Sequence, residues 1–459
     1  MKKPTRALAV ASSLALAGIA TSAGVASAAN TSFDQFSPLA SSVGPTADEA
    51  NPITFGSAAF QQRSIADRNT QLAAGEPNSG VWDMITVNET GPQKGSFLFT
   101  PFESSQSGIQ RTDLATEEIE TIWNSPAPGG HVAFDASYWT PWGTYVTAEE
   151  SWCSAPAGCT TSPYGRFLEL TNPLTADSVT VATGEEAVLE HRNVIPRVSH
   201  EGVQFDKRLN MYFIDELNGG SLYKYTSAAD WGDIKSGRAG FFDAGQTSVL
   251  RVGTGTTPNA TGTYTWVPIT DAQGQALPGA VTITDPNGVT SVDGRNTTDL
   301  PAFKGTDYQR PEDMQLQTLN GVERLYVATT TTNEVYALDL GAQSISVFAN
   351  TASTNLATGA PVGSGLTSPD NLALDAENNL YIVEDRNGGT DDDIWFARDL
   401  NLDGDLLDAG EGLGRWASNG TVGSEFTGLY FDPTDKRRAW VNIQHPASGN
   451  DRTIEITVK

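Results

Sequence analysis

The chain has 459 residues, with 28 Lys and Arg against 55 Asp and Glu, a formal net charge of −27 and only four His. Such an acidic balance argues against nucleic acid as a partner, because the phosphates would be repelled. With 45 Gly, 24 Pro, frequent turn signals and little helical periodicity, the composition favours an all-β fold over a helical one.

The first 29 residues read as a signal peptide. Basic residues at positions 2, 3 and 6 lead into an apolar run over 7–20, and Ala26-Ser27-Ala28 offers small residues for cleavage. We therefore expect a secreted or periplasmic protein. No other stretch is long and apolar enough to span a bilayer, so no membrane association is expected. Residues 30–80 are polar and irregular, and we expect them to wrap the surface and to supply a closing strand.

Residues 81–459 carry a recurring pair of apolar-alternating segments joined by turns, which is the pattern of β-hairpins. The pairs are 95–100 with 108–112, 143–147 with 165–170, 211–214 with 221–225, 324–329 with 334–338, 380–383 with 393–398, and 439–443 with 453–457. A repeated hairpin cannot bury its faces alone, so neighbouring sheets must stack, and a ring does this with short edges. We predict a six-bladed β-propeller, with five or seven blades as alternatives and 284–308 as an insertion loop.

The two cysteines, Cys153 and Cys159, lie six positions apart in a chain expected to reach an oxidising compartment. A local disulfide that pins a loop is the favoured interpretation. A soft-metal site is the alternative, although no histidine lies nearby.

Acidic residues cluster where the predicted strands begin and end. In a propeller, one end of each inner strand faces the axial channel, so carboxylates from separate sheets can meet there. Several carboxylates close together cannot all stay ionised without cations between them. Their oxygen-only chemistry favours calcium or another hard cation over zinc, and a solvated turn is the alternative for each residue taken alone. The predicted metal-binding residues are Glu149, Glu150, Glu201, Asp215, Glu312, Asp370, Glu384, Asp385 and Glu425.

Arg310 and His200 are the predicted catalytic residues. Arg310 precedes Glu312 and is interpreted either as a salt-bridge strut or as a forked donor to a phosphate or carboxylate of the substrate. His200 is either a satisfied structural histidine or a group that hydrogen-bonds a ligand or transfers a proton, and the same holds for His445.

A second acidic segment begins at Asp399. Alternating oxygen ligands followed by Gly404 match the start of a calcium loop. Gly410 occupies the position where such loops usually carry Glu, and Glu411 follows it. A plain acidic turn is the alternative to this peripheral structural calcium site. Its predicted ligands are Asp399, Asn401, Asp403, Asp405 and Asp408.

Six short motifs run in a fixed order through most of the expected mature chain. They are Thr140-Pro141-Trp142-Gly143-Thr144 with Glu149-Glu150, Ser199-His200-Glu201, Arg310-Pro311-Glu312-Asp313, Pro369-Asp370-Asn371-Leu372, Glu425-Phe426-Thr427-Gly428 and Asn442-Ile443-Gln444-His445-Pro446. As an ordered set they resemble the PhoX family of secreted bacterial alkaline phosphatases. The resemblance implies a six-bladed propeller, phosphomonoester hydrolysis and an iron–calcium cluster in the axial channel. It implies metal binding by Glu149, Glu201, Glu312 and Asp370, and a contact between Arg310 and the substrate phosphate.

The chain departs from the family pattern at two places. The family typically has a cysteine that ligates iron where this chain has Ala148, and an Asn-His-Glu sequence where it has Pro101-Phe102-Glu103. Loss of the soft thiolate should weaken iron binding more than calcium binding. We therefore expect Ca²⁺ as the principal cofactor, with Fe³⁺ as a weaker one.

The sequence favours a secreted, metal-dependent phosphoesterase that acts as a monomer on a small-molecule phosphoester. Two alternatives stay open. One is a non-enzymatic, calcium-stabilised propeller that binds protein or glycan. The other is a calcium-dependent lactonase or phosphotriesterase, because Pro369-Asp370-Asn371-Leu372 is also similar to that group.

Overall fold

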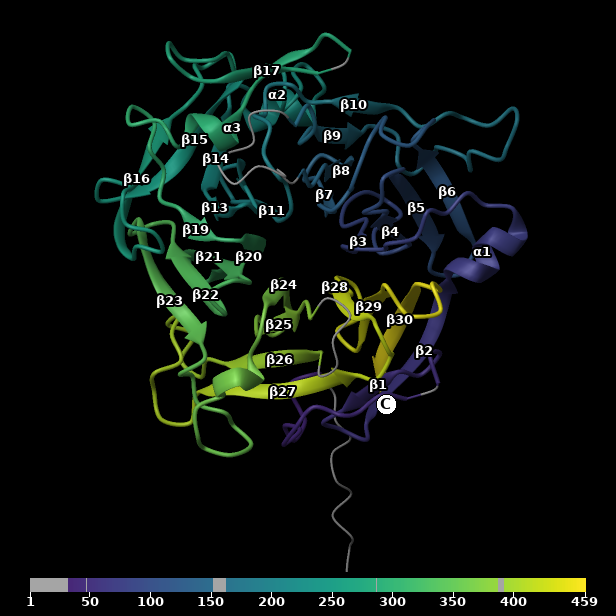
Figure 1. Cartoon of the computed structure of the whole chain (residues 1–459). Helices are drawn as coiled ribbons and strands as arrows, with labels where there is room; N and C mark the ends of the chain where they lie inside the picture. Colours follow the sequence, from purple (N-terminus) through teal and green to yellow (C-terminus); the bar gives the residue numbers. More distant parts are fainter. Residues whose placement is uncertain (1–31, 47, 152–161, 286, 387–391) are drawn as a thin grey trace, which may run out of the picture.

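Antiparallel sheets follow one another around a ring, in an all-β propeller-like arrangement (Figure 1). The computed structural model describes residues 32–46, 48–151, 162–285, 287–386 and 392–459. The predicted signal peptide, Cys153 and Cys159 therefore lie outside the described residues. Among the described residues, no helix combines the length and the apolar character needed to cross a membrane.

The first two sheets are formed by consecutive strands. One has the order β3-β4-β5-β6, with bounds Thr86–Val87, Phe97–Pro101, Gly108–Asp113 and Ile119–Asn124. The next has the order β7-β8-β9-β10, with bounds Tyr138–Trp139, Tyr145–Ala148, Phe167–Leu170 and Leu189–His191. Both contain a predicted hairpin, β4 with β5 and β8 with β9.

A nine-stranded sheet follows, made of two antiparallel runs. The first run is β11-β12-β14-β15-β16, with bounds Val203–Phe205, Asn210–Ile214, Leu222–Ser227, Gly245–Val252 and Gly262–Pro268. The second run is β20-β21-β22-β23, with bounds Pro311–Leu319, Val322–Thr329, Glu334–Asp339 and Ser344–Asn350. Only Gly262 with Ile345 and Thr263 with Ser344 pair the two runs.

The last two large sheets are completed by strands from the start of the described chain. One has the order β24-β25-β26-β27-β1, with bounds Pro369–Leu374, Leu380–Glu384, Asp393–Arg398, Gly412–Asn419 and Ile53–Phe55. The other has the order β28-β29-β30-β2, with bounds Glu425–Phe431, Arg438–Gln444, Arg452–Val458 and Phe60–Asp67. Because β2 pairs with β30, the two ends of the sequence close the ring within one sheet.

Smaller elements decorate the ring. The region 284–308, predicted as an insertion loop, contains short pieces of structure. The remaining elements are β13 (Asn218–Gly220) paired with β19 (Tyr308–Gln309), β17 (Thr282–Thr284) paired with β18 (Thr290–Val292), α1 (Arg68–Ala74), α2 (Trp231–Lys235), α3 (Gly294–Thr297) and η1 (Gly363–Gly365).

The turn between the first two strands of a sheet has a repeated construction. In the β11–β12 turn, Asp206 accepts hydrogen bonds from the Asn210 backbone and amide and from the Tyr212 hydroxyl, at 2.7–3.0 Å. The β24–β25 turn repeats these contacts with Asp375, Asn379 and Tyr381. A carboxylate that satisfies turn amides in this way fixes the register of both strands.

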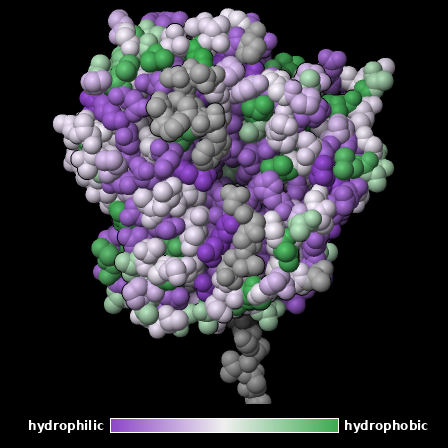
Figure 2. Space-filling view, viewed as in Figure 1, coloured by the Kyte–Doolittle hydropathy of each residue, from purple (hydrophilic) through white to green (hydrophobic). Residues whose placement is uncertain are grey.

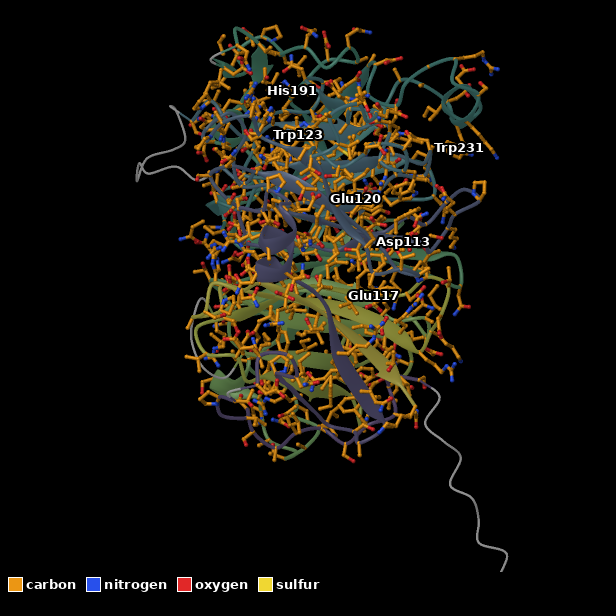
Figure 3. The ribbon with its side chains drawn as sticks, turned by 90° about the vertical axis from the view of Figure 1, so that its right-hand side faces the viewer. Asp113, Glu117, Glu120, Trp123, His191 and Trp231 are labelled. Carbon is orange, nitrogen blue, oxygen red and sulfur yellow. The ribbon has the colours of Figure 1, made fainter. Side chains whose placement is uncertain are left out.

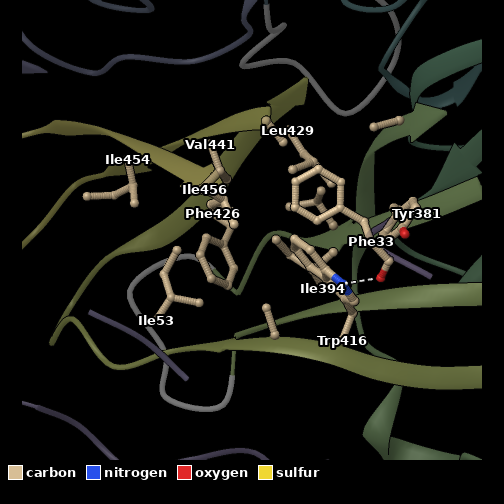
Figure 4. Close-up of a cluster of buried hydrophobic side chains, with 14 of the residues drawn as sticks. Phe33, Ile53, Tyr381, Ile394, Trp416, Phe426, Leu429, Val441, Ile454 and Ile456 are labelled. Atoms are coloured by element: carbon tan, nitrogen blue, oxygen red, sulfur yellow. Dashed lines mark hydrogen bonds between the residues drawn. The ribbon is translucent and has the colours of Figure 1, made fainter. Parts of the chain in front are cut away.

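Aromatic side chains fill the space between the last two sheets (Figure 4). Trp416 on β27 is fully buried, packs edge-on against Phe33, and donates its indole N–H to the Phe33 carbonyl at 3.1 Å. Tyr381 lies 5.3 Å from the same indole ring, centroid to centroid. Large buried aromatic side chains contribute roughly 1.5–3 kcal/mol each to stability. Residue 33 therefore belongs to the core rather than to a loose surface segment.

Candidate metal centre in the axial cavity

A cavity of about 440 Å³ receives side chains from all the large sheets, which places it near the centre of the ring. Figure 2 shows hydrophilic residues gathered around a hollow near the middle of the face. Ten carboxylates line the cavity: Asp83, Glu103, Asp135, Glu150, Glu201, Glu216, Glu312, Asp370, Asp385 and Glu425. The other lining residues are Ala133, Arg310, Thr427, Gln444 and His445.

Six of these carboxylates stand at or just before the start of a sheet's first strand. They are Asp83 before β3, Asp135 before β7, Glu201 before β11, Glu312 in β20, Asp370 in β24 and Glu425 in β28. Because the first strand of each sheet runs away from the cavity, the same position in each sheet delivers one carboxylate to it.

The other four carboxylates follow the end of a sheet's second strand, which is antiparallel to the first and returns to the cavity. They are Glu103 after β4, Glu150 after β8, Glu216 after β12 and Asp385 after β25. In the last sheet, Gln444 at the end of β29 and the following His445 take this position. Five strand runs therefore contribute two strand ends each to the cavity, and the run β20–β23 contributes only the start of β20.

Three predicted metal-binding residues, Glu149, Asp215 and Glu384, do not line the cavity. Each immediately precedes a residue that does: Glu150, Glu216 and Asp385. Successive side chains of an extended chain point to opposite sides, so only one residue of each acidic pair can face the cavity. The expectation that Glu149, Asp215 and Glu384 converge on the cavity is corrected by this alternation.

Glu149 is held by a complete set of protein donors. Its carboxylate accepts from the Arg166 guanidinium at 2.5 and 2.9 Å and from the backbone N–H groups of Gly165 and Arg166 at 3.1 and 3.0 Å. Although burial alone would raise it, the pKa of Glu149 is lowered to about 2 by hydrogen bonds from His131 and Arg166 and by the charge of Arg166. The family resemblance implies that Glu149 binds metal, but here its carboxylate is paired with Arg166.

Asp215 and Glu384 hold the loops that lead to two of the first strands. Asp215 accepts from the Ser199 backbone N–H at 3.0 Å, and burial raises its pKa to about 7. Glu384 accepts from the Thr367 backbone N–H at 2.8 Å and from the Trp395 indole N–H at 3.0 Å. Both carboxylates hold loops that lead to the cavity, and neither carboxylate lines it.

Within the cavity, two groups of carboxylates bring one oxygen per residue within 4.8 Å of one another. One group is Asp83, Glu103 and Asp135, and the other is Glu201, Glu216 and Glu312. Gln444 lies beside the first group and donates its amide to Asp83 at 3.2 Å and to Glu103 at 3.0 Å. Oxygen atoms at this spacing are a donor set suited to hard cations.

The electrostatics of these groups are unfavourable for the protein on its own. Burial, and then repulsion from Asp370, raises the pKa of Glu201 well above its ordinary value, and burial with repulsion from Glu216 does the same for Glu312. Glu201 Oε2 and Asp135 Oδ1 are buried and accept no hydrogen bond from any residue that the structure describes. Such oxygens could be satisfied by a bound cation.

Arg310 lies between two of the carboxylates. Its Nη2 is 2.6 Å from Glu216 Oε1 and its Nε is 3.2 Å from Glu312 Oε1. The charges of Glu312 and Glu216 outweigh burial and raise its pKa. The Arg310 backbone has a positive φ of +54°. Ser368 and His445 also have positive φ values, +47° and +56°. All three precede a proline beside the cavity, and such strained backbone is concentrated at functional sites.

His200 does not reach the cavity, although the sequence suggested a catalytic role. Its side chain is fully buried and its ring lies 5.6 and 5.4 Å from the rings of Phe167 and Phe213. Burial lowers its pKa to about 3, so the imidazole is neutral at ordinary pH. This placement corrects the catalytic interpretation, because the ring packs among aromatic side chains outside the cavity lining.

The predicted calcium loop connects β26 to β27. Asp399 accepts from the Gly404 backbone N–H at 2.9 Å, and Asn401 donates to Asp403 and Asp408 at 2.9 and 2.8 Å. Glu411 turns back and accepts from Leu400 and Asp408 at 2.9 and 3.0 Å. The two carboxylate groups found among the described residues include none of the loop's side chains. Calcium binding here, including by Asp405, stays a prediction.

Four carboxylates of the cavity, Asp83, Glu103, Asp135 and Glu216, are not among the predicted metal-binding residues. Asp83 and Asp135 were missed because β3 and β7 are two residues long and give no alternating pattern. For Glu216, the spacing would have sufficed, since it follows its strand by two residues, as Glu150 does.

Three solved structures resemble this chain at low sequence identity. Among solved structures, a putative gluconolactonase matches with 12% identity, 91% of this chain and 97% of that chain covered, and a TM-score of 0.39. A gluconolactonase from Xanthomonas campestris matches with 11% identity, 92% and 100% coverage and a TM-score of 0.44. The β-propeller domain of Cps50 (Swd1) from Myceliophteria thermophila matches with 11% identity, 82% and 98% coverage and a TM-score of 0.36.

No curated protein matches the chain. The family model described as alkaline phosphatase PhoX matches residues 136–447, which is more than half of the 459 residues and includes Glu150, Glu201, Arg310, Glu312, Asp370 and Glu425. The chain belongs to the alkaline phosphatase PhoX family.

Proposed function

We propose that this protein is a cation-dependent phosphomonoester hydrolase whose reaction takes place in the axial cavity. The observation that carries the proposal is the lining of this cavity, where ten carboxylates surround Arg310 in a chain of the PhoX family. A cavity this acidic would repel a phosphate unless cations were bound there first.

The residues present fit hard cations. The donors are carboxylate oxygens in two groups, and buried oxygens of Glu201 and Asp135 have no hydrogen-bond donor among the described residues. Asp83, Glu103 and Asp135 would hold one cation, and Glu201, Glu216 and Glu312 a second. We propose Ca²⁺ as the main cation and Fe³⁺ as a weaker one, because no cysteine is among the described lining residues.

Bound cations would polarise the phosphoryl oxygens and lower the pKa of a water molecule. Arg310 would donate its guanidinium N–H groups to the phosphate and neutralise charge that develops in the transition state. Gln444 would keep Asp83 and Glu103 oriented through its two hydrogen bonds. Asp215 and Glu384 would hold the loops from which Glu201 and Asp370 reach the cavity.

The test is hydrolysis of p-nitrophenyl phosphate by chelated protein to which calcium, iron or both are returned. We expect activity to disappear with the chelator and to return with cation. Arg310→Ala should lower kcat/KM by a factor on the order of 100, the usual effect of removing a donor to the transition state. The matched control is Arg437→Ala, whose side chain is 54% exposed. Absence of turnover with every cation would contradict the proposal.

We also propose that the ring has six blades. The nine-stranded sheet supports this count, because its two antiparallel runs are joined by only two residue pairs between β16 and β23. Each run then forms one blade, alongside the four other large sheets.

For location and partners, the family is generally secreted or periplasmic, and we propose export for this chain as well. The protein would act as a monomer on small phosphoesters, without nucleic acid or membrane partners. Fractionation of a culture into medium, periplasm and cytoplasm would test the first of these points.

A further inference from the structure

Arg310 is the one lysine or arginine among the described residues that line the axial cavity, and it stands against ten carboxylates. A positive charge in that position has two possible partners: the carboxylates around it, or an anionic ligand. The structure shows Arg310 with the carboxylates.

The guanidinium joins residues from two different runs of strands. Glu216 follows β12 and lies 2.6 Å from Nη2, whereas Glu312 lies in β20 and is 3.2 Å from Nε. These two glutamates and Glu201 form one of the two groups suited to a cation. Arg310 therefore forms ion pairs with two of the three carboxylates that the proposed cation would need.

The Arg310 backbone is fixed while its side chain is partly accessible. The Thr330 backbone N–H donates to the Arg310 carbonyl at 3.1 Å, and Pro311 follows directly. The side chain is 25% exposed and lines the cavity, whereas Glu216 and Glu312 are almost wholly buried. A long side chain on a fixed backbone can exchange partners within the cavity without a change of fold.

We propose that Arg310 is an exchangeable internal counter-cation: it holds Glu216 and Glu312 together before a cation binds and turns to the substrate phosphate afterwards. This inference rests on the proposed function, since it requires that the carboxylates bind a cation. It makes Arg310 a competitor of the cation as well as a partner of the phosphate. By thermodynamic linkage, cation and phosphate then each increase the affinity for the other.

Calcium titration of chelated protein by isothermal calorimetry tests the competition. Arg310→Gln should bind Ca²⁺ at least about tenfold more tightly than the wild type, a difference of about 1.4 kcal/mol. Arg310→Lys separates exchange from a simple charge effect, because an ammonium keeps the charge but cannot bridge two carboxylates with a fork. Its affinity for Ca²⁺ should lie between those of the wild type and Arg310→Gln.

Two results of this titration would overturn the inference. In one, Arg310→Gln binds Ca²⁺ no more tightly than the wild type. In the other, Arg310→Lys equals the wild type, so that only the charge matters. Arg437→Gln, an exposed arginine at a turn, controls for net charge and should leave the affinity unchanged. Circular dichroism of each variant verifies that the sheets are intact.

Inorganic phosphate supplies the second measurement. Its affinity for the wild type should rise at least about tenfold when calcium is added, and this increase should be much smaller in Arg310→Gln. If the wild type binds calcium and hydrolyses phosphoesters but phosphate affinity is independent of calcium, the exchange is wrong and the proposed function stands. If the wild type binds no calcium, the exchange is wrong, and turnover with iron returned decides the proposed function separately.

Discussion

Two arginine–glutamate sites, one at Glu149 and the other at Arg310, differ in kind. At Glu149, one carboxylate receives hydrogen bonds from Arg166 and from two backbone N–H groups, and its pKa falls to about 2. At Arg310, one guanidinium serves Glu216 and Glu312, and the pKa of Glu312 rises well above its ordinary value. The first site has enough positive partners and the second has too few.

This difference separates structural from functional carboxylates without reference to their place in a motif. A buried carboxylate with all its donors gains nothing from a cation, whereas crowded carboxylates with one shared donor are stabilised by it. On the proposed function, Glu149 serves stability, and Glu201, Glu216 and Glu312 serve cation binding.

Arg166→Met should have the largest effect on stability. It leaves the Glu149 carboxylate buried without its charged partner, and removal of one member of such a pair costs about 3–5 kcal/mol of unfolding free energy. Urea unfolding followed by tryptophan fluorescence measures the change. The double variant with Glu149→Gln should recover part of the loss. Wild-type stability in Arg166→Met would show that the pair is not structural.

Glu149→Gln should show a pH-dependent loss. Because the folded-state pKa is lowered from 4.5 to about 2, the ionised carboxylate stabilises the fold above pH 4.5, and this contribution disappears as the pH falls towards 2. The shift corresponds to roughly 3 kcal/mol. The difference in unfolding free energy between wild type and variant should therefore be large at pH 6 and small at pH 2.5. A difference that is constant with pH would contradict the assignment.

The cavity should show the opposite pH dependence when cations are removed. The pKa values of Glu201 and Glu312 are raised, so their contribution to stability is complete below about pH 4.5 and is lost as the pH rises. Chelated protein should melt at progressively lower temperature from pH 5 to pH 9.

Calcium should reverse this trend. At a concentration 100 times the dissociation constant it stabilises the fold by about 2.7 kcal/mol per site. Glu201→Gln with Glu312→Gln should reduce the response to calcium, and Glu149→Gln should retain it. An equal calcium response in these two variants would remove the distinction between the sites.

Glu117→Gln should have the smallest effect. Glu117 lies at the outer side of the ring (Figure 3) and pairs with Arg63, and both side chains are more than 40% exposed. An exposed pair contributes about 0–1 kcal/mol. Urea unfolding should place this variant within that range, and a loss above 2 kcal/mol would show that exposure does not separate the ion pairs of this protein.

Much of the fold could be predicted because every sheet repeats the same hairpin. The predicted pairings, such as 211–214 with 221–225 and 324–329 with 334–338, occur as β12 with β14 and β21 with β22. The closing strand β2 was less visible, since its partner β30 lies almost 400 residues away in sequence.

The cavity was harder to predict than the ring. Alternation along a strand decides which member of an acidic pair faces inwards. This cannot be predicted from the sequence alone, because the sequence does not fix the residue at which the strand ends. The sequence alone does not distinguish Glu150 from Glu149. In the structure β8 ends at Ala148, and Glu150 is the one that lines the cavity. The partner of Glu149 is Arg166, seventeen residues away, and a local motif could not reveal it.

The central claim is that carboxylates from separate sheets share cations at the centre of the ring. Elemental analysis of protein purified without added metal tests it most directly, with wild type, Glu149→Gln and the Glu201→Gln/Glu312→Gln variant compared side by side. We predict bound calcium in the first two proteins and a clear reduction in the third. Equal metal content in all three, or none in the wild type, would contradict the account.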